Sequence, residues 1–288
     1  MNNIKIYAFA DEASPIIDKQ ITALKENGLQ GLEIRNVDNV NISEISNAKA
    51  KEVKKKLDDA GLTVWSIGSP IGKIDIEKDS FAVHTEKFRR TLEIAEILGA
   101  ENIRLFSFFI PKGKNPVDYK QEVINRLGTF LDLANGTGIT LCHENEKGIY
   151  GDIPERCLEI HKALPEMPAI FDPANYIQCG ADTLKAWEII KGFVKYLHIK
   201  DALPNGSVVP AGKGIGNLPF ILDDFRKNGG KCVTIEPHLT VFSGLAALEK
   251  EGDNSVVGEV YRYPSNTLAF KAAADALKEL ILGENKCK

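Results

Sequence analysis

The feature that most constrains this sequence is an alternation, repeated eight times, of short apolar segments with longer segments of helical periodicity. The apolar segments are rich in β-branched and aromatic residues and have the length of strands. They cover residues 4–10, 31–35, 62–68, 102–109, 139–145, 169–174, 194–201 and 232–238. Strands that alternate with helices form parallel βαβ units. Eight such units in 288 residues predict a (β/α)8 TIM barrel.

The segments between the strands carry helix signals, among them residues 14–28, 81–100 and 122–138. Several of these helices are predicted to end at glycines, namely Gly28, Gly61, Gly99 and Gly229. No linker or low-complexity stretch divides the chain, so one domain spanning residues 1–288 is predicted. The alternative fold is a doubly wound open sheet, but no G-x-G-x-x-G motif follows the first strand.

Charge and cysteine content exclude several classes of protein. The formal net charge of −4 gives no electrostatic signature of nucleic acid or membrane binding. The five cysteines form no CxxC pair and resemble reduced thiols of a cytosolic protein. The amino-terminal segment leads directly into the first strand without the features of a signal peptide, and no apolar run approaches membrane-spanning length. A cytoplasmic protein with no nucleic acid or membrane partner is therefore predicted.

Four potential metal ligands interrupt the apolar strands, one on each of the last four. They are Glu144, Asp172, His198 and Glu236. Each lies at the carboxyl end of its strand, where side chains from neighbouring strands of a barrel converge. Three carboxylates around one point repel one another, so they require a cation. The sequence therefore predicts one divalent metal site.

Side-chain alternation supports an inward direction for these residues. In the seventh strand it turns His198 and Lys200 into the barrel, and in the eighth it does the same for Glu236 and His238. Asp172 and Glu236 each precede a proline, which disfavours helical backbone and holds them extended.

The ligand set indicates which metal the site prefers. Two glutamates, one aspartate and one histidine offer mostly hard oxygen ligands, so Mn²⁺ is the first choice, with Mg²⁺, Co²⁺ and Zn²⁺ as alternatives. Each residue also has a structural alternative. Asp172 could cap a helix or join a salt bridge, and His198 could be an ordinary core histidine. Four such residues at equivalent depth on consecutive strands favour a shared site.

Five motifs resemble those of a known family: "HENE" at 143–146, "FDPANY" at 171–176, "YLHIKDA" at 196–202, "VVPAGKGIGNLP" at 208–219 and "IEPHL" at 235–239. They are similar to the xylose isomerase-like TIM barrels, the sugar phosphate isomerase/epimerase group. The resemblance implies that Glu144, Asp172, His198 and Glu236 hold one divalent cation. It also implies that Glu144 and Glu236 flank the substrate as catalytic acid and base.

Chemistry supports the same interpretation. Epimerisation or isomerisation of a sugar removes a proton from a carbon beside a carbonyl and gives an enediolate. A chelated cation stabilises the developing charge, and two carboxylates on opposite sides remove and return the proton. The prediction is a metal-dependent isomerase or epimerase of a sugar, sugar phosphate or keto sugar. Glu146 is predicted to be a loop carboxylate or substrate contact, and His143 to face the helices.

Three alternatives remain open. A metal-dependent dehydratase or β-elimination lyase acting on a keto-polyol or keto-glycoside begins with the same proton abstraction. A carbohydrate-binding barrel without catalysis would use the same fold. An apurinic endonuclease-like nuclease is least favoured, because its three-metal cluster requires further histidines. The third and fourth strands supply none, and Asn175 stands where a histidine would be needed.

Six residues are predicted to bind substrate: Lys200, Asn175, His238, Glu33, Arg35 and Arg104, all but Asn175 on the expected inward face of a strand. Weaker candidates for the pocket wall are Asp11, Glu12, Ser69 and Lys73. Lys200 could instead neutralise Glu144, and Arg104 could belong to a structural Glu–Arg pair. The glycines at 212–216 could cradle a phosphate or only permit a tight turn.

Two connections, 110–118 and 239–265, are longer than a βα loop requires. Both are expected at the carboxyl face of the barrel, as surface excursions or as contacts in a homo-oligomer. The second is also a candidate lid.

Overall fold

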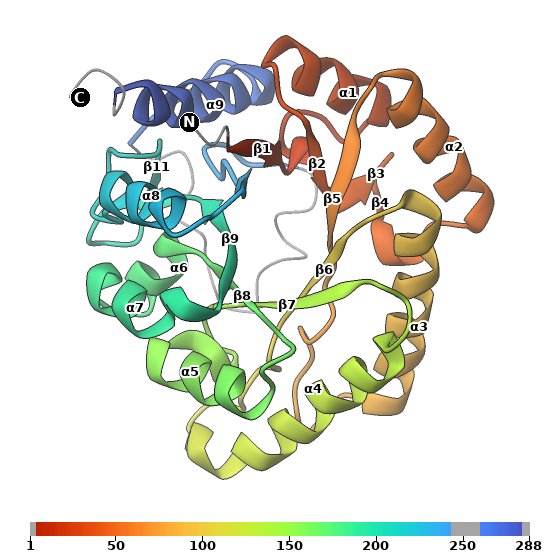
Figure 1. Ribbon diagram of the computed structural model, residues 1–288, viewed down its shortest axis with the longest axis vertical. Helices are drawn as coiled ribbons and strands as arrows, with labels where there is room; N and C mark the ends of the chain where they lie inside the picture. Colours follow the sequence, from red (N-terminus) through yellow and green to blue (C-terminus); the bar gives the residue numbers. More distant parts are fainter. Residues whose placement is uncertain (1–3, 243–259, 284–288) are drawn as a thin grey trace.

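The eight predicted strands form one closed parallel barrel in the computed structural model, which describes residues 4–242 and 260–283 (Figure 1). Around the ring the order is β1-β12-β9-β8-β7-β6-β5-β2. These strands are β1 (Lys5–Ala8), β2 (Gly31–Ile34), β5 (Thr63–Gly68), β6 (Asn102–Leu105), β7 (Thr140–Glu144), β8 (Ala169–Phe171), β9 (Val194–Ile199) and β12 (Cys232–Ile235). The predicted single-domain (β/α)8 barrel is confirmed, and the alternative open sheet is wrong.

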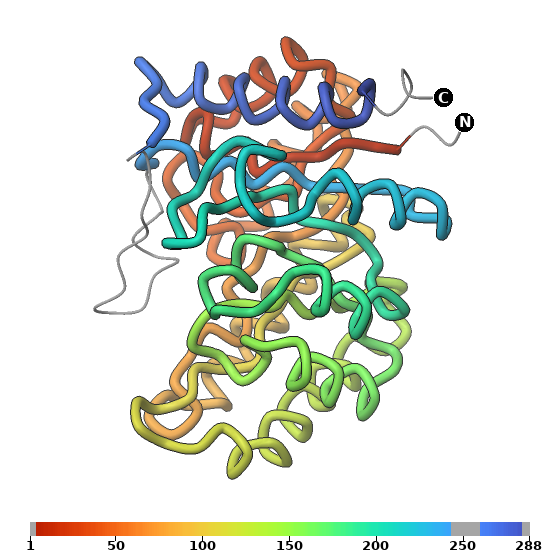
Figure 2. Tube along the Cα trace, turned by 90° about the vertical axis from the view of Figure 1, so that its left-hand side faces the viewer, coloured from red at the N-terminus to blue at the C-terminus, as the bar shows by residue number. Residues whose placement is uncertain are grey.

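Helices surround the barrel, and at least one follows each strand. They are α1 (Ile17–Glu26), α2 (Asn47–Asp59), α3 (Phe81–Leu98), α4 (Lys120–Ala134), α5 (Pro154–Ala163), α6 (Pro173–Gln178), α7 (Thr183–Ile190), α8 (Leu218–Lys227) and α9 (Asn266–Gly283). Gly99 ends α3 with a left-handed φ of 66°, as predicted for a helix stop. In Figure 2 the last helix, α9, lies beside α1, where the ring closes.

Several short elements were not predicted, because they are too short to show a periodic pattern. Two hairpins pair β3 (Asn36–Val37) with β4 (Val40–Asn41), and β10 (Asp201–Ala202) with β11 (Val208–Val209). The 3₁₀ segments are η1 (Ala10–Glu12), η2 (Ile42–Glu44), η3 (Pro116–Tyr119), η4 (Tyr150–Asp152) and η5 (Lys191–Phe193). The first of these, η1, carries two carboxylates to the mouth of the barrel.

The barrel interior holds an apolar cluster of Tyr7, Trp65, Cys142, Ile170, Tyr196 and Cys232. Their neighbours along the strands, such as Leu197 and Val233, instead belong to the large core formed with the helices. Side chains two positions apart on a strand share a face. Glu144, Asp172 and His198 each lie two positions after a member of the interior cluster. They therefore continue that interior toward the carboxyl ends of the strands.

Three further predictions concern the loops, the cysteines and the membrane. The long connection predicted at 239–265 falls largely outside the described residues, so the structure does not test its role as a lid or a contact. Four cysteines, at 142, 157, 179 and 232, are free thiols, and Cys287 lies outside the described residues. None of the described helices combines the length and the hydropathy needed to span a bilayer.

Candidate metal centre

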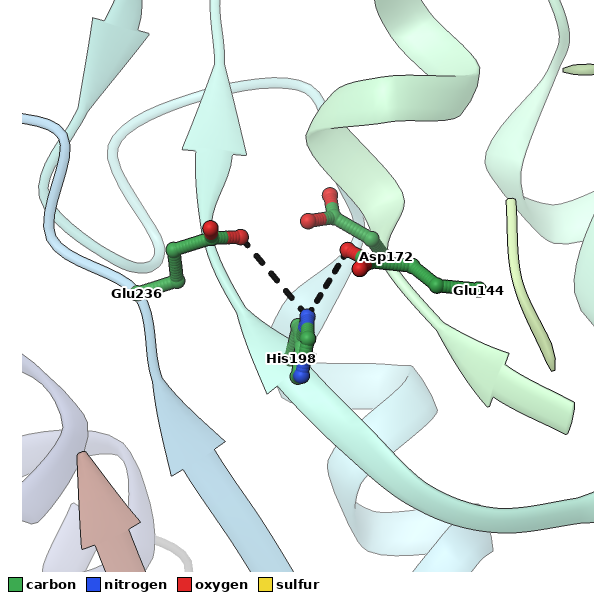
Figure 3. Close-up of side chains that lie close together, drawn as sticks. All are labelled: Glu144, Asp172, His198 and Glu236. Carbon is green, nitrogen blue, oxygen red and sulfur yellow. Dashed lines mark hydrogen bonds and ion pairs between the residues drawn. The ribbon is translucent and has the colours of Figure 1, made fainter. Parts of the chain in front are cut away.

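Four side chains from four neighbouring strands converge at the carboxyl end of the barrel (Figure 3). They belong to Glu144, Asp172, His198 and Glu236, all buried, and one ligand atom of each lies within 4.8 Å of the others. His198 lies between the two glutamates. Its Nδ1 is 2.8 Å from Oε1 of Glu144 and 3.6 Å from Oε2 of Glu236. The convergence predicted from the sequence is therefore present.

Asp172 is fixed by the start of α6. Its backbone is extended (φ −110°, ψ 109°), and its Oδ1 accepts a hydrogen bond of 2.9 Å from the amide of Asn175. Asn145 holds the backbone on the other side, accepting from the Asp172 amide at 2.9 Å and donating to its carbonyl at 3.0 Å. The predicted helix-cap role therefore occupies Oδ1 of Asp172, and Oδ2 accepts no hydrogen bond from the described residues. The role of Asn145 was not predicted; its only sequence signal is its position next to Glu144.

The other ring nitrogen of His198, Nε2, contacts a buried glutamate. This nitrogen lies 3.0 Å from Oε2 of Glu33, whose Oε1 accepts a 3.1 Å hydrogen bond from Tyr196. Burial would lower the pKa of His198, but Glu144 and Glu33 outweigh burial and raise it to about 10. Both ring nitrogens of His198 thus face a carboxylate, and binding of a metal ion by the imidazole would require it to give up a proton.

Lys200 enters the same cluster. Its Nζ lies 2.8 Å from Oδ2 of Asp172 and 2.8 Å from Oε2 of Glu236. Neutralisation of carboxylates was one of the predicted roles for Lys200, although the contacted residues are these two rather than Glu144. Burial would raise the pKa of Glu236, but Lys200, His238 and other cations hold it well below its usual range.

Glu144 is positioned by an arginine and an amide. Nη1 of Arg104 lies 3.2 Å from its Oε2, and Nδ2 of Asn175 donates to its Oε1 at 3.4 Å. The guanidinium of Arg104 also lies over the ring of Phe9, at 5.0 Å from its centroid, and over that of Phe106, at 4.9 Å. A buried Glu–Arg pair was predicted for Arg104, and its partner in the structure is Glu144.

Arg35 links Glu236 to the end of the first strand. It lies 2.9 Å from Asp11, 3.1 Å from Glu12 and 3.4 Å from Glu236. Nδ1 of His238 lies 3.0 Å from Oε1 of Glu12. All six predicted substrate-binding residues therefore contact the four-residue cluster directly or through one neighbour.

A cavity of about 590 Å³ lies beside this network. Asp11, which binds Arg35, is on its wall, together with Phe242 and the start of α9. The volume is that of a small-molecule site.

The glycine-rich loop does not present free amides to a ligand. The Asp201 carboxylate accepts hydrogen bonds from the amides of Gly212, Gly214 and Gly216 at 2.9, 3.0 and 2.8 Å. A Cβ on Gly214 would lie 2.3 Å from the carbonyl oxygen of Ala202. The tight-turn interpretation is therefore confirmed and the phosphate cradle is wrong.

The remaining polar residues of the "HENE" motif lie around the cluster. His143 faces the helices as predicted, with its Nε2 2.9 Å from Oγ of Ser107 and its ring edge-on to His161 of α5. Glu146 is a loop carboxylate that pairs with Lys73 at 2.9 Å.

The four-residue cluster fits a divalent cation. Its donors are three carboxylates and one imidazole, a set typical of such ions. Oε2 of Glu144 and Oδ2 of Asp172 are buried and accept no hydrogen bond from the described residues. Nη1 of Arg104 lies 3.2 Å from the first and Nζ of Lys200 lies 2.8 Å from the second, so both oxygens are next to a positive charge. These oxygens therefore retain coordination capacity.

A second group, Glu12, Glu236 and His238, has the same spacing of potential ligand atoms. The Arg35 guanidinium already binds both of its glutamates, so this group fits a metal ion less well.

Comparison with known proteins gives a family match and several similar structures. A family model described as "Xylose isomerase-like TIM barrel" matches residues 21–255. Among curated proteins, none matches the chain. The IolI protein with a bound zinc atom superimposes with a TM-score of 0.74 at 14% identity, covering 97% of this chain and 99% of that one.

Two further similar structures are of proteins with different activities, an epimerase and a probable dehydratase. D-psicose 3-epimerase superimposes with a TM-score of 0.72 at 18% identity, covering 97% of this chain and 100% of that one. The probable 3-DHS dehydratase AsbF from Bacillus anthracis gives a TM-score of 0.71 at 16% identity, covering 96% and 99%. At these identities the likeness shows a shared fold.

Proposed function

The chain belongs to the xylose isomerase-like TIM barrel family, and on that premise we propose that it is a metal-dependent isomerase or epimerase of a sugar, sugar phosphate or keto sugar. The observation that carries the proposal is the placement of two carboxylates. Glu144 and Glu236 come from β7 and from the end of β12, with β8 and β9 between them in the barrel. Both approach Nδ1 of His198, at 2.8 and 3.6 Å, so they border one small volume from two sides (Figure 3).

This placement suits proton transfer across a planar carbon. One carboxylate removes a proton from the carbon beside the carbonyl, and the other delivers a proton to the opposite face. The low pKa of Glu236 keeps it ionised at neutral pH, as a base must be. Over one turnover the pair takes up one proton and gives up one, so its net charge does not change.

Glu144, Asp172, His198 and Glu236 would hold the cation, and Mn²⁺ is the proposed ion because most of the donors are carboxylate oxygens. When bound, the cation would stabilise the negative charge that develops on the substrate oxygen. Lys200 and His238 border the cluster and are the proposed substrate contacts. The other four candidates touch proposed ligands and would hold them in position: Glu33, Arg35, Arg104 and Asn175.

A dehydratase or β-elimination lyase is the second candidate, because both reactions begin with removal of the same kind of proton by the same carboxylates. The two classes differ in the fate of the intermediate. Epimerisation returns a proton, whereas elimination expels water or an alcohol from the neighbouring carbon.

The test is solvent exchange in D₂O. The protein, supplied with Mn²⁺, is incubated with a panel of ketoses, ketose phosphates and 3-keto-glycosides, and the products are analysed by NMR and mass spectrometry. We expect one solvent deuterium at the carbon beside the carbonyl, together with the epimer or isomer. Glu144→Gln and Glu236→Gln should abolish the exchange, and the exposed Glu86→Gln should preserve it. A product that has lost water or an alcohol would identify the lyase, and no exchange into any compound would refute both assignments.

A further inference from the structure

A second cavity, of about 630 Å³, lies at the opposite end of the barrel from the candidate metal centre. Its lining residues come from the segments that enter β9 and β12 and from the neighbouring helices α7 and α8. These two helices lie next to each other on the outside of the barrel (Figure 1). Its wall includes Val194 and Lys195 at the start of β9, and Lys231 and Cys232 at the start of β12. Since the metal-centre residues lie at the carboxyl ends of the same strands, the two sites are separate.

The charge of the cavity wall is positive. Lys191, Lys195 and Lys231 line it, against one carboxylate, Asp224, and of the three lysines Lys191 already pairs with Glu188 at 2.7 Å. The Asp224 carboxylate is already engaged, because it accepts hydrogen bonds from Trp187 at 2.7 Å and from Asn228 at 3.1 Å.

Two of these lysines are available to a ligand, since Lys195 is half-buried and Lys231 is exposed to solvent. Nζ of Lys195 donates to the neutral hydroxyl of Thr140 at 2.9 Å. Within residues 4–242 and 260–283, neither Lys195 nor Lys231 forms an ion pair with a carboxylate. An anion in the cavity would supply the missing partner.

The other side of the cavity is aromatic. Trp65, Trp187 and Phe225 contribute to the wall, beside Val194 and Cys232. Trp65 is 8% exposed, and its indole N–H is buried. This N–H donates to no acceptor among the described residues. A buried donor without an acceptor is unfavourable, and a ligand acceptor atom would satisfy it.

We propose that this cavity is a binding site for a small aromatic anion, a carboxylate or a phosphate ester. The ring of the ligand would pack against the tryptophans and Phe225. Its anionic group would pair with Lys195 and Lys231, and one acceptor atom would reach the Trp65 N–H. The proposal does not depend on the function assigned to the metal centre.

Tryptophan fluorescence gives a direct test, since the only two tryptophans in the chain, Trp65 and Trp187, both line the cavity. The full-length protein is titrated with benzoate and phenyl phosphate, and with benzyl alcohol as a neutral analogue. We expect a saturable change with at least one anion, and binding at least about tenfold weaker for the alcohol.

Variants locate the binding. Lys195→Gln combined with Lys231→Gln should weaken the anion by about tenfold or more, because it removes both unpaired charges. Lys162→Gln, the same change on the exposed face of α5, should leave the affinity unchanged. Glu236→Gln should also leave it unchanged, which separates this cavity from the metal centre.

Three results would overturn the proposal. They are the absence of a saturable signal up to about 10 mM anion, equal affinity for the neutral analogue, and loss of binding in Glu236→Gln but not in the lysine pair variant. Circular dichroism of each variant checks that the fold is retained.

Discussion

The ammonium group of Lys200 lies 2.8 Å from Oδ2 of Asp172, a carboxylate oxygen that accepts no hydrogen bond from the described residues. The same ammonium is 2.8 Å from Oε2 of Glu236. Lys200 therefore supplies positive charge to two proposed metal ligands in the metal-free protein. A divalent cation bound to these oxygens would compete electrostatically with that charge, so Lys200 should limit the affinity for metal.

Replacement of Lys200 by methionine tests this competition. The variant keeps most of the side-chain volume but removes the charge, so Mn²⁺ should bind about tenfold more tightly, measured by calorimetry. Without metal the same variant should lose about 3 kcal/mol of stability, because two buried carboxylates lose their cation. The exposed Lys19→Met is the matched control. Unchanged or weaker Mn²⁺ binding would show that Lys200 and the metal ion do not compete.

Metal content per chain tests the ligand set itself. Protein purified without chelator or affinity metal should carry about one divalent ion per chain by elemental mass spectrometry. Asp172→Ala and Glu236→Ala should each abolish the bound metal, and the exposed Asp132→Ala should retain it. Three zinc ions per chain would favour the nuclease alternative. No metal, even after Mn²⁺ is offered, would identify the cluster as a salt-bridge network.

The fold and the convergence of the four candidate ligands were accessible from sequence because both follow from periodicity. Alternation along a strand fixes the direction of His198, and barrel symmetry brings the strand ends together. The ion-pair partners of Lys200 could not be predicted from the sequence. Lys200 could reach Glu144, Asp172 or Glu236, and only the side-chain conformation decides among them.

Hydrogen bonds between side chains and nearby backbone groups also could not be predicted from the sequence. Asn145 and Asp201 brace the site and the glycine-rich loop, yet each is an ordinary polar residue in the sequence. Their roles depend on which backbone amides the fold brings near, which periodicity does not encode. The sequence leaves the amides of the 212–216 glycines open as donors to a ligand, whereas in the fold the Asp201 carboxylate accepts their hydrogen bonds.

Two buried histidines should make the protein sensitive to acid. His84 accepts a 2.8 Å hydrogen bond from the amide of Gly72, and the ring of His161 lies against Phe193. Burial lowers the pKa of each from 6.5 to about 4. The unfolded chain therefore binds protons first as the pH falls below 6.5, and stability should decline between pH 6.5 and pH 4.

Urea unfolding at pH 7, 6, 5 and 4 measures this decline. Each histidine should contribute a loss of about 2–3 kcal/mol across the window. His161→Gln should be less stable than the native chain at pH 7 but should show a smaller pH dependence. An equal slope in the variant and the native chain would mean that His161 is not a source of the acid sensitivity.

The last prediction concerns Asp201, whose carboxylate organises the glycine-rich loop. Replacement by asparagine keeps the shape but exchanges one acceptor oxygen for an NH₂ group, so at least one of the loop amides of Gly212, Gly214 and Gly216 loses its acceptor. Burying such an amide unpaired should lower the free energy of unfolding by about 2–3 kcal/mol in urea titrations. Asp132→Asn, on the exposed face of α4, should change it little. Hydrogen exchange adds a local reading, since the three glycine amides should lose protection in Asp201→Asn while those of β9 keep theirs. Unchanged protection would mean that the loop is held by its backbone geometry rather than by this carboxylate.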